Sequence, residues 1–94
     1  MALIDDVRLA LRLKNDKFDS GELEPIIKAA IRELSITGVE RIEETDPLVK
    51  RAVVLYAKAS FGYEDKSEKF MSAFKSLRDS MALSGDYKEK FDEI

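Results

Sequence analysis

The segment from Asp46 to Gly62 constrains the fold of this chain more than any other. It reads DPLVKRAVVLYAKASFG, in which an aspartate suited to capping a helix precedes a proline at the first helical position. Charged side chains follow only at Lys50, Arg51 and Lys58. A helix that is apolar nearly all round is normally buried on several sides. We therefore expect this helix to lie at the centre of the fold.

Two helices are expected before the central one. The first covers about residues 3–13, with its apolar face formed by Leu3, Val7, Ala10 and Leu11. The second opens at the D-x-x-E capping pattern of residues 19–22, carries Pro25 in its first turn, and repeats apolar residues at helical spacing. Gly38 follows as the natural stop in the left-handed conformation.

One more helix and a tail are expected after it. A second D-x-x-E pattern begins at Asp65, and an apolar stripe then continues to about Leu83. Because all the connections are short, neighbouring helices should pack against each other. The sequence thus predicts an all-α bundle of about four helices at residues 1–83, with a C-terminal turn and tail at residues 84–94.

The residue types present leave little for catalysis. The chain has 94 residues, enough for one domain, and contains neither cysteine nor histidine. This excludes disulfides, thiolate nucleophiles, zinc fingers and histidine bases. Neighbouring carboxylates, as at Asp5-Asp6 and Glu43-Glu44, occur at helix starts, in a loop or in the tail, where solvation or capping explains them. No glycine-rich phosphate loop is present. We expect no enzyme activity, no cofactor and no metal.

Membranes and nucleic acids are not the expected partners either. The longest uninterrupted apolar run is residues 52–57, and the first residues carry no basic leader, so neither a membrane span nor a signal peptide is expected. The net charge of -3 gives no general attraction to nucleic acid.

Charge is nevertheless distributed unevenly around the central helix. An acidic stretch with Glu40, Glu43 and Glu44 runs directly into the helix that carries Lys50, Arg51 and Lys58. These three cations share a sector of about 100° on the helix, and Val54 and Phe61 lie among them. Apolar residues ringed by charge are typical of a subunit interface. Alternatively, another helix of the same chain covers them.

The tail contains a second candidate contact surface. Tyr87, Phe91 and Ile94 are apolar or aromatic residues within a charged terminal segment. They either fold back on the bundle or order on a partner, and we expect a partner.

Three strings resemble one known family. The opening MALIDDVRLALRL, the block at Asp46–Gly62 and the closing SLRDSMALSGDY at Ser76–Tyr87 are similar to the small head–tail connector proteins of tailed bacteriophages, a family also named for phage DNA packaging. The resemblance runs in order from about Leu3 to Tyr87. The acidic loop and the residues after Tyr87 match no family pattern.

The resemblance implies a structural role in the virion. Such proteins are α-helical, form a ring of identical subunits, dock under the portal protein after DNA packaging, and offer a platform to the next connector or tail-completion protein. DNA passes through the ring as non-specific cargo, and no catalytic residues are implied. The expected location is the head–tail junction of a virion assembled in the bacterial cytoplasm.

A ring requires two different faces on each subunit. We expect the acidic loop of one subunit to meet the basic sector of the next, with charge setting the register of the contact. Two alternatives remain open at this point. One is a small DNA-binding regulator of the helix-turn-helix type, and the other is a host helical protein of unrelated function.

Overall fold

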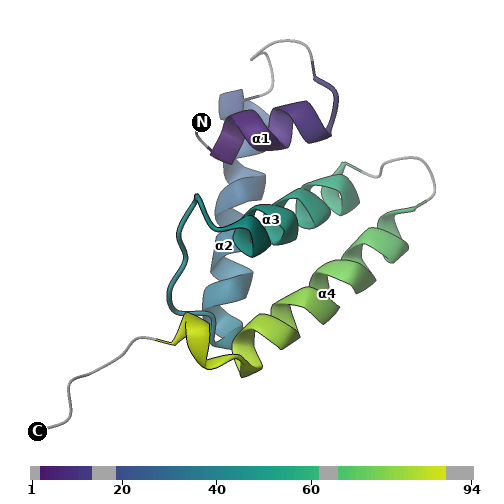
Figure 1. The fold of residues 1–94 in the computed structure, drawn as a ribbon. Coiled ribbons are helices and arrows are strands. Elements are labelled where there is room, and N and C mark those ends of the chain that lie inside the picture. Colours follow the sequence, from purple (N-terminus) through teal and green to yellow (C-terminus); the bar gives the residue numbers. More distant parts are fainter. Residues whose placement is uncertain (1–2, 14–18, 62–65, 89–94) are drawn as a thin grey trace, which may run out of the picture.

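A computed structural model of the chain describes residues 3–13, 19–61 and 66–88. Its elements in chain order are α1 (Leu3–Ala10), a turn of π-helix η1 (Asp19–Leu23), α2 (Glu24–Thr37), α3 (Pro47–Ser60), α4 (Ser67–Leu83) and a 3-10 turn η2 (Gly85–Tyr87). These residues include four α-helices and no strand, so the predicted all-α fold is confirmed (Figure 1).

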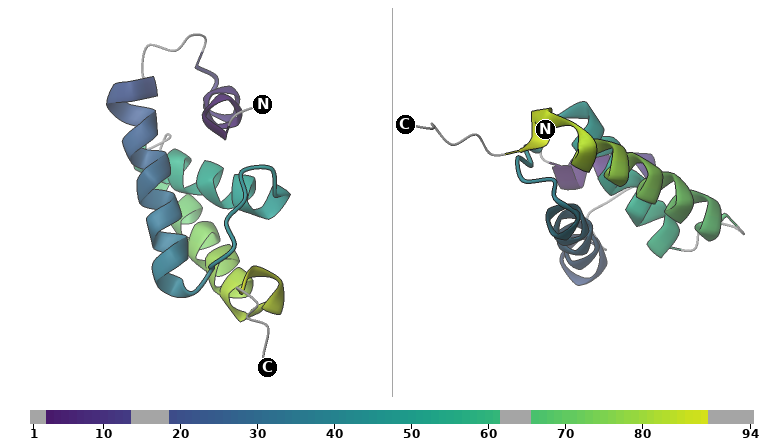
Figure 2. Two further views of the ribbon diagram at one scale, coloured as in Figure 1. Left: turned by 90° about the vertical axis from the view of Figure 1, so that its left-hand side faces the viewer. Right: turned by 90° about the horizontal axis from the view of Figure 1, so that it is seen from below.

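Helix α3 lies at the centre of the fold, as its sequence predicts. It packs against α1, α2 and α4, and α2 crosses it at a steep angle (Figures 1 and 2). Its buried residues are Val49, Ala52, Val53, Leu55 and Ala57. The predicted cap is also present, since Oδ1 of Asp46 accepts hydrogen bonds from the backbone N–H groups of Leu48 at 2.8 Å and Val49 at 3.3 Å. The helix therefore begins where the Asp-Pro pattern places it.

Helix α4 runs back along α3, so that the two form an antiparallel pair (Figure 1). Phe74 of α4 is fully buried, and its ring meets that of Tyr56 of α3 edge-on, with 5.0 Å between the ring centroids. Such edge-to-face pairs stabilise the folded state beyond the effect of burying the two rings. The helix ends at Leu83, as expected, whereas the capping residue expected at Asp65 lies outside the described residues.

Helix α2 ends as predicted but begins differently. At its C-terminus Gly38 has a φ of 118°, and the N–H of Val39 donates to the carbonyl of Leu34 at 2.9 Å. At its start the chain turns as a π-helix from Asp19, and the α-helix begins at Glu24. Pro25 explains the difference: it has no N–H to donate to the preceding turn, which is therefore free to widen.

Helix α1 is shorter than the sequence indicates. It ends at Ala10, and Arg12 takes the left-handed conformation with a φ of 61°. The N–H of Leu13 then donates to the carbonyl of Arg8, and that of Arg12 to the carbonyl of Leu9, both at 3.0 Å. This is the same closing motif as at Gly38, formed here without a glycine. The expected boundary at Leu13 is therefore wrong, because the sequence carries no glycine signal for the stop.

Candidate subunit-contact site

The basic sector of α3 is partly engaged within the subunit. Nζ of Lys50 lies 3.4 Å from Oδ2 of Asp6 in α1, and Nζ of Lys58 lies 5.4 Å from the centre of the Phe70 ring in α4. Arg51, by contrast, is exposed. Of the three cations expected at an interface, Arg51 is thus the one that projects most fully from the surface.

Val54 and Phe61, the apolar residues of that sector, are half-buried. Both pack against the core of their own chain while keeping part of their surface accessible. Other residues of the same chain therefore bury part of the apolar surface of Val54 and Phe61. What remains accessible could contribute to a contact only together with the charged residues around it.

The acidic loop is likewise divided between internal and exposed positions. Oε1 of Glu44 accepts a hydrogen bond from the backbone N–H of Leu3 at 3.2 Å, which ties the loop to the first residue of α1. A carboxylate at a helix N-terminus is also favoured by the helix dipole. The side chains of Glu40 and Glu43 are exposed. These two carboxylates, together with the exposed part of Glu44, form the acidic surface of the loop.

Tyr87 is buried within its own subunit. Only 7% of its surface is exposed, and its hydroxyl donates to Oδ1 and Oδ2 of Asp46 at 3.1 and 3.0 Å. Its carbonyl accepts hydrogen bonds from the N–H groups of Glu40 at 2.7 Å and Arg41 at 2.9 Å. Tyr87 thus ties both ends of the acidic loop to the C-terminal turn. The expectation that it meets a partner does not suit this conformation, since a buried aromatic residue stabilises its own subunit.

Burial, the hydrogen bond to Asp46 and the charge of that carboxylate, in that order of weight, raise the pKa of Tyr87 from 10.0 to about 12, with Asp86 adding a smaller effect. The phenol therefore stays protonated and donates at any physiological pH. The other two residues expected to contact a partner from the tail, Phe91 and Ile94, lie outside the described residues.

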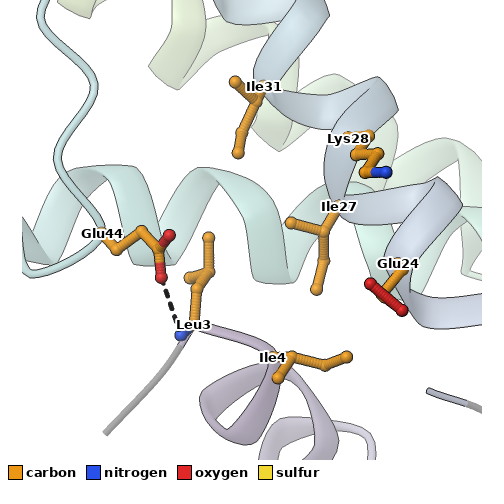
Figure 3. A pocket seen from close by; sticks show the side chains of 7 residues that line it. All are labelled: Leu3, Ile4, Glu24, Ile27, Lys28, Ile31 and Glu44. Atoms are coloured by element: carbon orange, nitrogen blue, oxygen red, sulfur yellow. Dashed lines mark hydrogen bonds between the residues drawn. The ribbon is translucent and has the colours of Figure 1, made fainter. Parts of the chain in front are cut away.

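The structure has a depression between α1 and α2 that the sequence did not predict. It has a volume of about 330 Å³ and is lined by Leu3, Ile4, Glu24, Ile27, Lys28, Ile31 and Glu44 (Figure 3). Aliphatic side chains from both helices form its floor, while three charged residues lie around them. The periodic apolar residues of α2 were visible in the sequence. That two helices leave a hollow between them depends on how they cross, which residue spacing does not encode.

Exposed aliphatic residues are a further feature that sequence reasoning missed. They are Leu9 with 67% of its surface exposed, Ile36 with 69%, Leu48 with 44% and Leu83 with 88%. Single exposed leucines are common on protein surfaces. Together with the open apolar depression, they leave apolar surface accessible on several elements of the described chain.

Within residues 3–13, 19–61 and 66–88, no group of three or more acidic side chains is placed to hold a metal ion. Among the same residues, none of the helices has the length and apolar character needed to cross a lipid bilayer. What the surface does provide is separate acidic, basic and apolar areas. Such a surface is suited to binding other proteins.

Comparison with known proteins identifies one family. The family model described as phage connector protein matches residues 3–88, which is nearly the whole chain and includes every described helix. Comparison with curated proteins gives no match, and comparison with solved structures gives none either. The matched region extends through Tyr87 and therefore includes the C-terminal turn that holds the acidic loop.

Proposed function

The chain belongs to the phage connector protein family, and we propose on that basis that it is an adaptor at the head–tail junction of a phage virion. In this role identical subunits form a ring that docks to the portal protein after DNA packaging. The ring extends the DNA channel and offers a platform to the next connector or tail-completion protein. The observation that carries the proposal is the family match over residues 3–88.

The surface of the subunit is compatible with a closed ring. A ring needs a heterologous interface, in which one face of a subunit meets a different face of the next. The exposed carboxylates Glu40 and Glu43 and the exposed Arg51 supply opposite charges on separate elements, the loop before α3 and α3 itself. We propose that they face each other across the interface, where they would set register more than affinity.

We propose that the residues after Tyr87 contact the portal protein. Because Tyr87 is anchored to Asp46, the chain leaves the folded body at a fixed point next to the acidic loop. Phe91 and Ile94 would then supply apolar side chains from a segment attached to a rigid base.

Catalysis forms no part of the proposal, since the family is a structural one. DNA would pass through the ring without being read, and a chain with a net charge of -3 is suited to a channel in which DNA slides. The protein would accordingly be found in the virion after assembly in the host cytoplasm.

Electron microscopy of the purified protein, alone and mixed with portal rings of the same phage, tests the proposal. We expect rings, and added density on one face of the portal. A portal that stays bare at high subunit concentration would contradict it.

Filter binding of duplex DNA at low and high salt addresses the regulator alternative. A connector should show no tight binding at either salt concentration, whereas a regulator should bind with a clear salt dependence.

A further inference from the structure

We propose that the depression between α1 and α2 of one subunit receives Leu9 of a second copy of this chain. The inference rests on the proposed ring and specifies part of its interface. It follows from three features of the described residues: an apolar hollow, an exposed leucine on the helix that borders it, and opposite charges around the two.

The receiving side is apolar and held in place. Leu3 and Ile27 form the buried part of its floor, and the partly exposed Ile4 and Ile31 extend it (Figure 3). Its volume of about 330 Å³ lies at the low end of the range seen for binding pockets, which suits a few side-chain atoms of a partner. The hydrogen bond between Glu44 and the N–H of Leu3 fixes one wall.

The inserted side chain comes from the same helix. Leu9 follows Ile4 by five residues, which places the two about 140° apart around the axis of α1. Ile4 borders the depression, whereas Leu9 is 67% exposed. One helix therefore contributes to the hollow on one side and carries a projecting leucine on another. Since the two surfaces differ, a contact between them is heterologous and can repeat from subunit to subunit, as a ring requires.

Charge selects Leu9 among the exposed aliphatic residues. The rim of the depression carries Glu24, Glu44 and Lys28, an excess of negative charge. The exposed Arg12 follows Leu9 by three residues. The other charges of α1 near Leu9 are balanced, Asp5 by Arg8 at 2.9 Å and Asp6 by Lys50 at 3.4 Å. The surroundings of Leu9 are thus positive and complement the rim.

The other three exposed residues fit less well. Leu83 lies between Asp79 and Asp86, whose charge has the same sign as that of the rim. Ile36 follows Arg32 and Glu33, which balance each other. Leu48 is the least exposed of the four. Charge and exposure together therefore favour Leu9 as the side chain that enters the depression.

Cysteine cross-linking tests the contact directly, because the natural chain contains no cysteine. Leu9→Cys is placed in one full-length chain and Lys28→Cys in another that carries a tag, and the two are mixed with a short thiol-specific cross-linker. We expect a mixed dimer at least several-fold above that formed by a Leu83→Cys and Lys28→Cys pair. Equal yields for the two pairs, or a larger yield with Leu83→Cys, would overturn the inference.

A charge exchange provides a second measurement on the same surface. Glu24→Arg alone and Arg12→Glu alone should each weaken self-association measured by sedimentation velocity at least several-fold, and the double variant should recover most of it. Circular dichroism confirms that each variant is folded. Absence of recovery would count against the pairing of these two surfaces.

The outcomes also separate this inference from the proposed function. If rings form on the portal while the Leu9 pair cross-links no better than its control, the connector function stands and the inference fails. If the Leu9 pair cross-links selectively but no ring docks on the portal, the contact between copies stands and the connector function fails.

Discussion

The hydroxyl of Tyr87 donates to both carboxylate oxygens of Asp46, at 3.1 and 3.0 Å, across 41 residues of sequence. The same carboxylate caps α3 through the N–H groups of Leu48 and Val49. One side chain thus joins the start of the central helix to the C-terminal turn. Because the carbonyl of Tyr87 also accepts hydrogen bonds from the N–H groups of Glu40 and Arg41, this residue holds both ends of the acidic loop.

Tyr87→Phe should lower the free energy of unfolding by about 1–2 kcal/mol, since it removes a hydrogen bond to a charged acceptor while leaving the ring in the core. Urea denaturation followed by circular dichroism measures this. Tyr56→Phe is the matched control: its hydroxyl makes no hydrogen bond within the described part of the chain, so the loss should stay below about 0.5 kcal/mol. Equal losses for the two variants would show that the Tyr87–Asp46 bond contributes nothing specific.

Alkaline pH should weaken the fold through the same bond. The pKa of Tyr87 is raised to about 12, so the folded state holds the phenol proton more tightly than the unfolded chain does. The resulting stabilisation is complete below pH 10 and is lost as the pH rises from about 10 to about 12. Stability measured across this range should therefore fall more steeply for the natural chain than for Tyr87→Phe. Parallel curves would contradict the assignment.

The closing residue of α1 offers a stabilising substitution. Arg12 has a φ of 61°, a conformation that costs a residue with a Cβ about 1–2 kcal/mol. Arg12→Gly should raise the free energy of unfolding by about 0.5–1 kcal/mol, after allowing for the greater freedom of glycine in the unfolded chain. Chemical denaturation measures the change.

Gly38→Ala is the reciprocal change at the equivalent position of α2. There φ is 118°, and the added Cβ would lie 2.8 Å from Nζ of Lys88, which donates to the Gly38 carbonyl. A loss of about 1 kcal/mol or more is expected. If both substitutions are neutral, the left-handed conformations are not maintained in solution.

These two helix ends show how far sequence reasoning extends. Gly38 predicts the end of α2 and Asp46-Pro47 predicts the start of α3, because both signals depend on local backbone conformation and capping. Arg12 adopts the same left-handed conformation without any such signal, since the tertiary packing of Leu13 against the core helps to fix it. Local patterns therefore predict the helices well and predict their ends only where a special residue is present.

Contacts between distant segments lie further beyond the sequence. Tyr87 looks like part of a charged tail until the fold places it against Asp46, and Lys50 looks like a free surface cation until α1 brings Asp6 to it. The depression beside Ile4 is lined by residues of α1, α2 and the loop before α3, which only the fold brings together. The central position of α3, by contrast, follows from its composition alone.

Arg51→Glu should weaken assembly while leaving the fold intact. Arg51 is exposed, so its replacement removes no internal contact described for α3, and charge reversal at an interface slows association and alters its salt dependence. Light scattering across a salt series measures assembly. Lys58→Glu is a useful comparison, since it also removes the contact with Phe70 and should cost about 0.5–1 kcal/mol of stability. Unchanged assembly in both variants would rule out the basic sector as an interface.

The ion pair between Asp6 and Lys50 should stabilise the fold more than a partly exposed ion pair usually does. Oδ2 of Asp6 is buried and has no hydrogen bond among the described residues, so Nζ of Lys50 at 3.4 Å is the charge that compensates it. Lys50→Met keeps the aliphatic stem but leaves the carboxylate uncompensated, which should cost about 1–2 kcal/mol. Lys50→Met combined with Asp6→Asn should recover part of that loss, because the buried charge is then gone as well. Denaturation of both variants and of Asp6→Asn alone completes the double-mutant cycle, and purely additive losses would mean that the two side chains do not interact in solution.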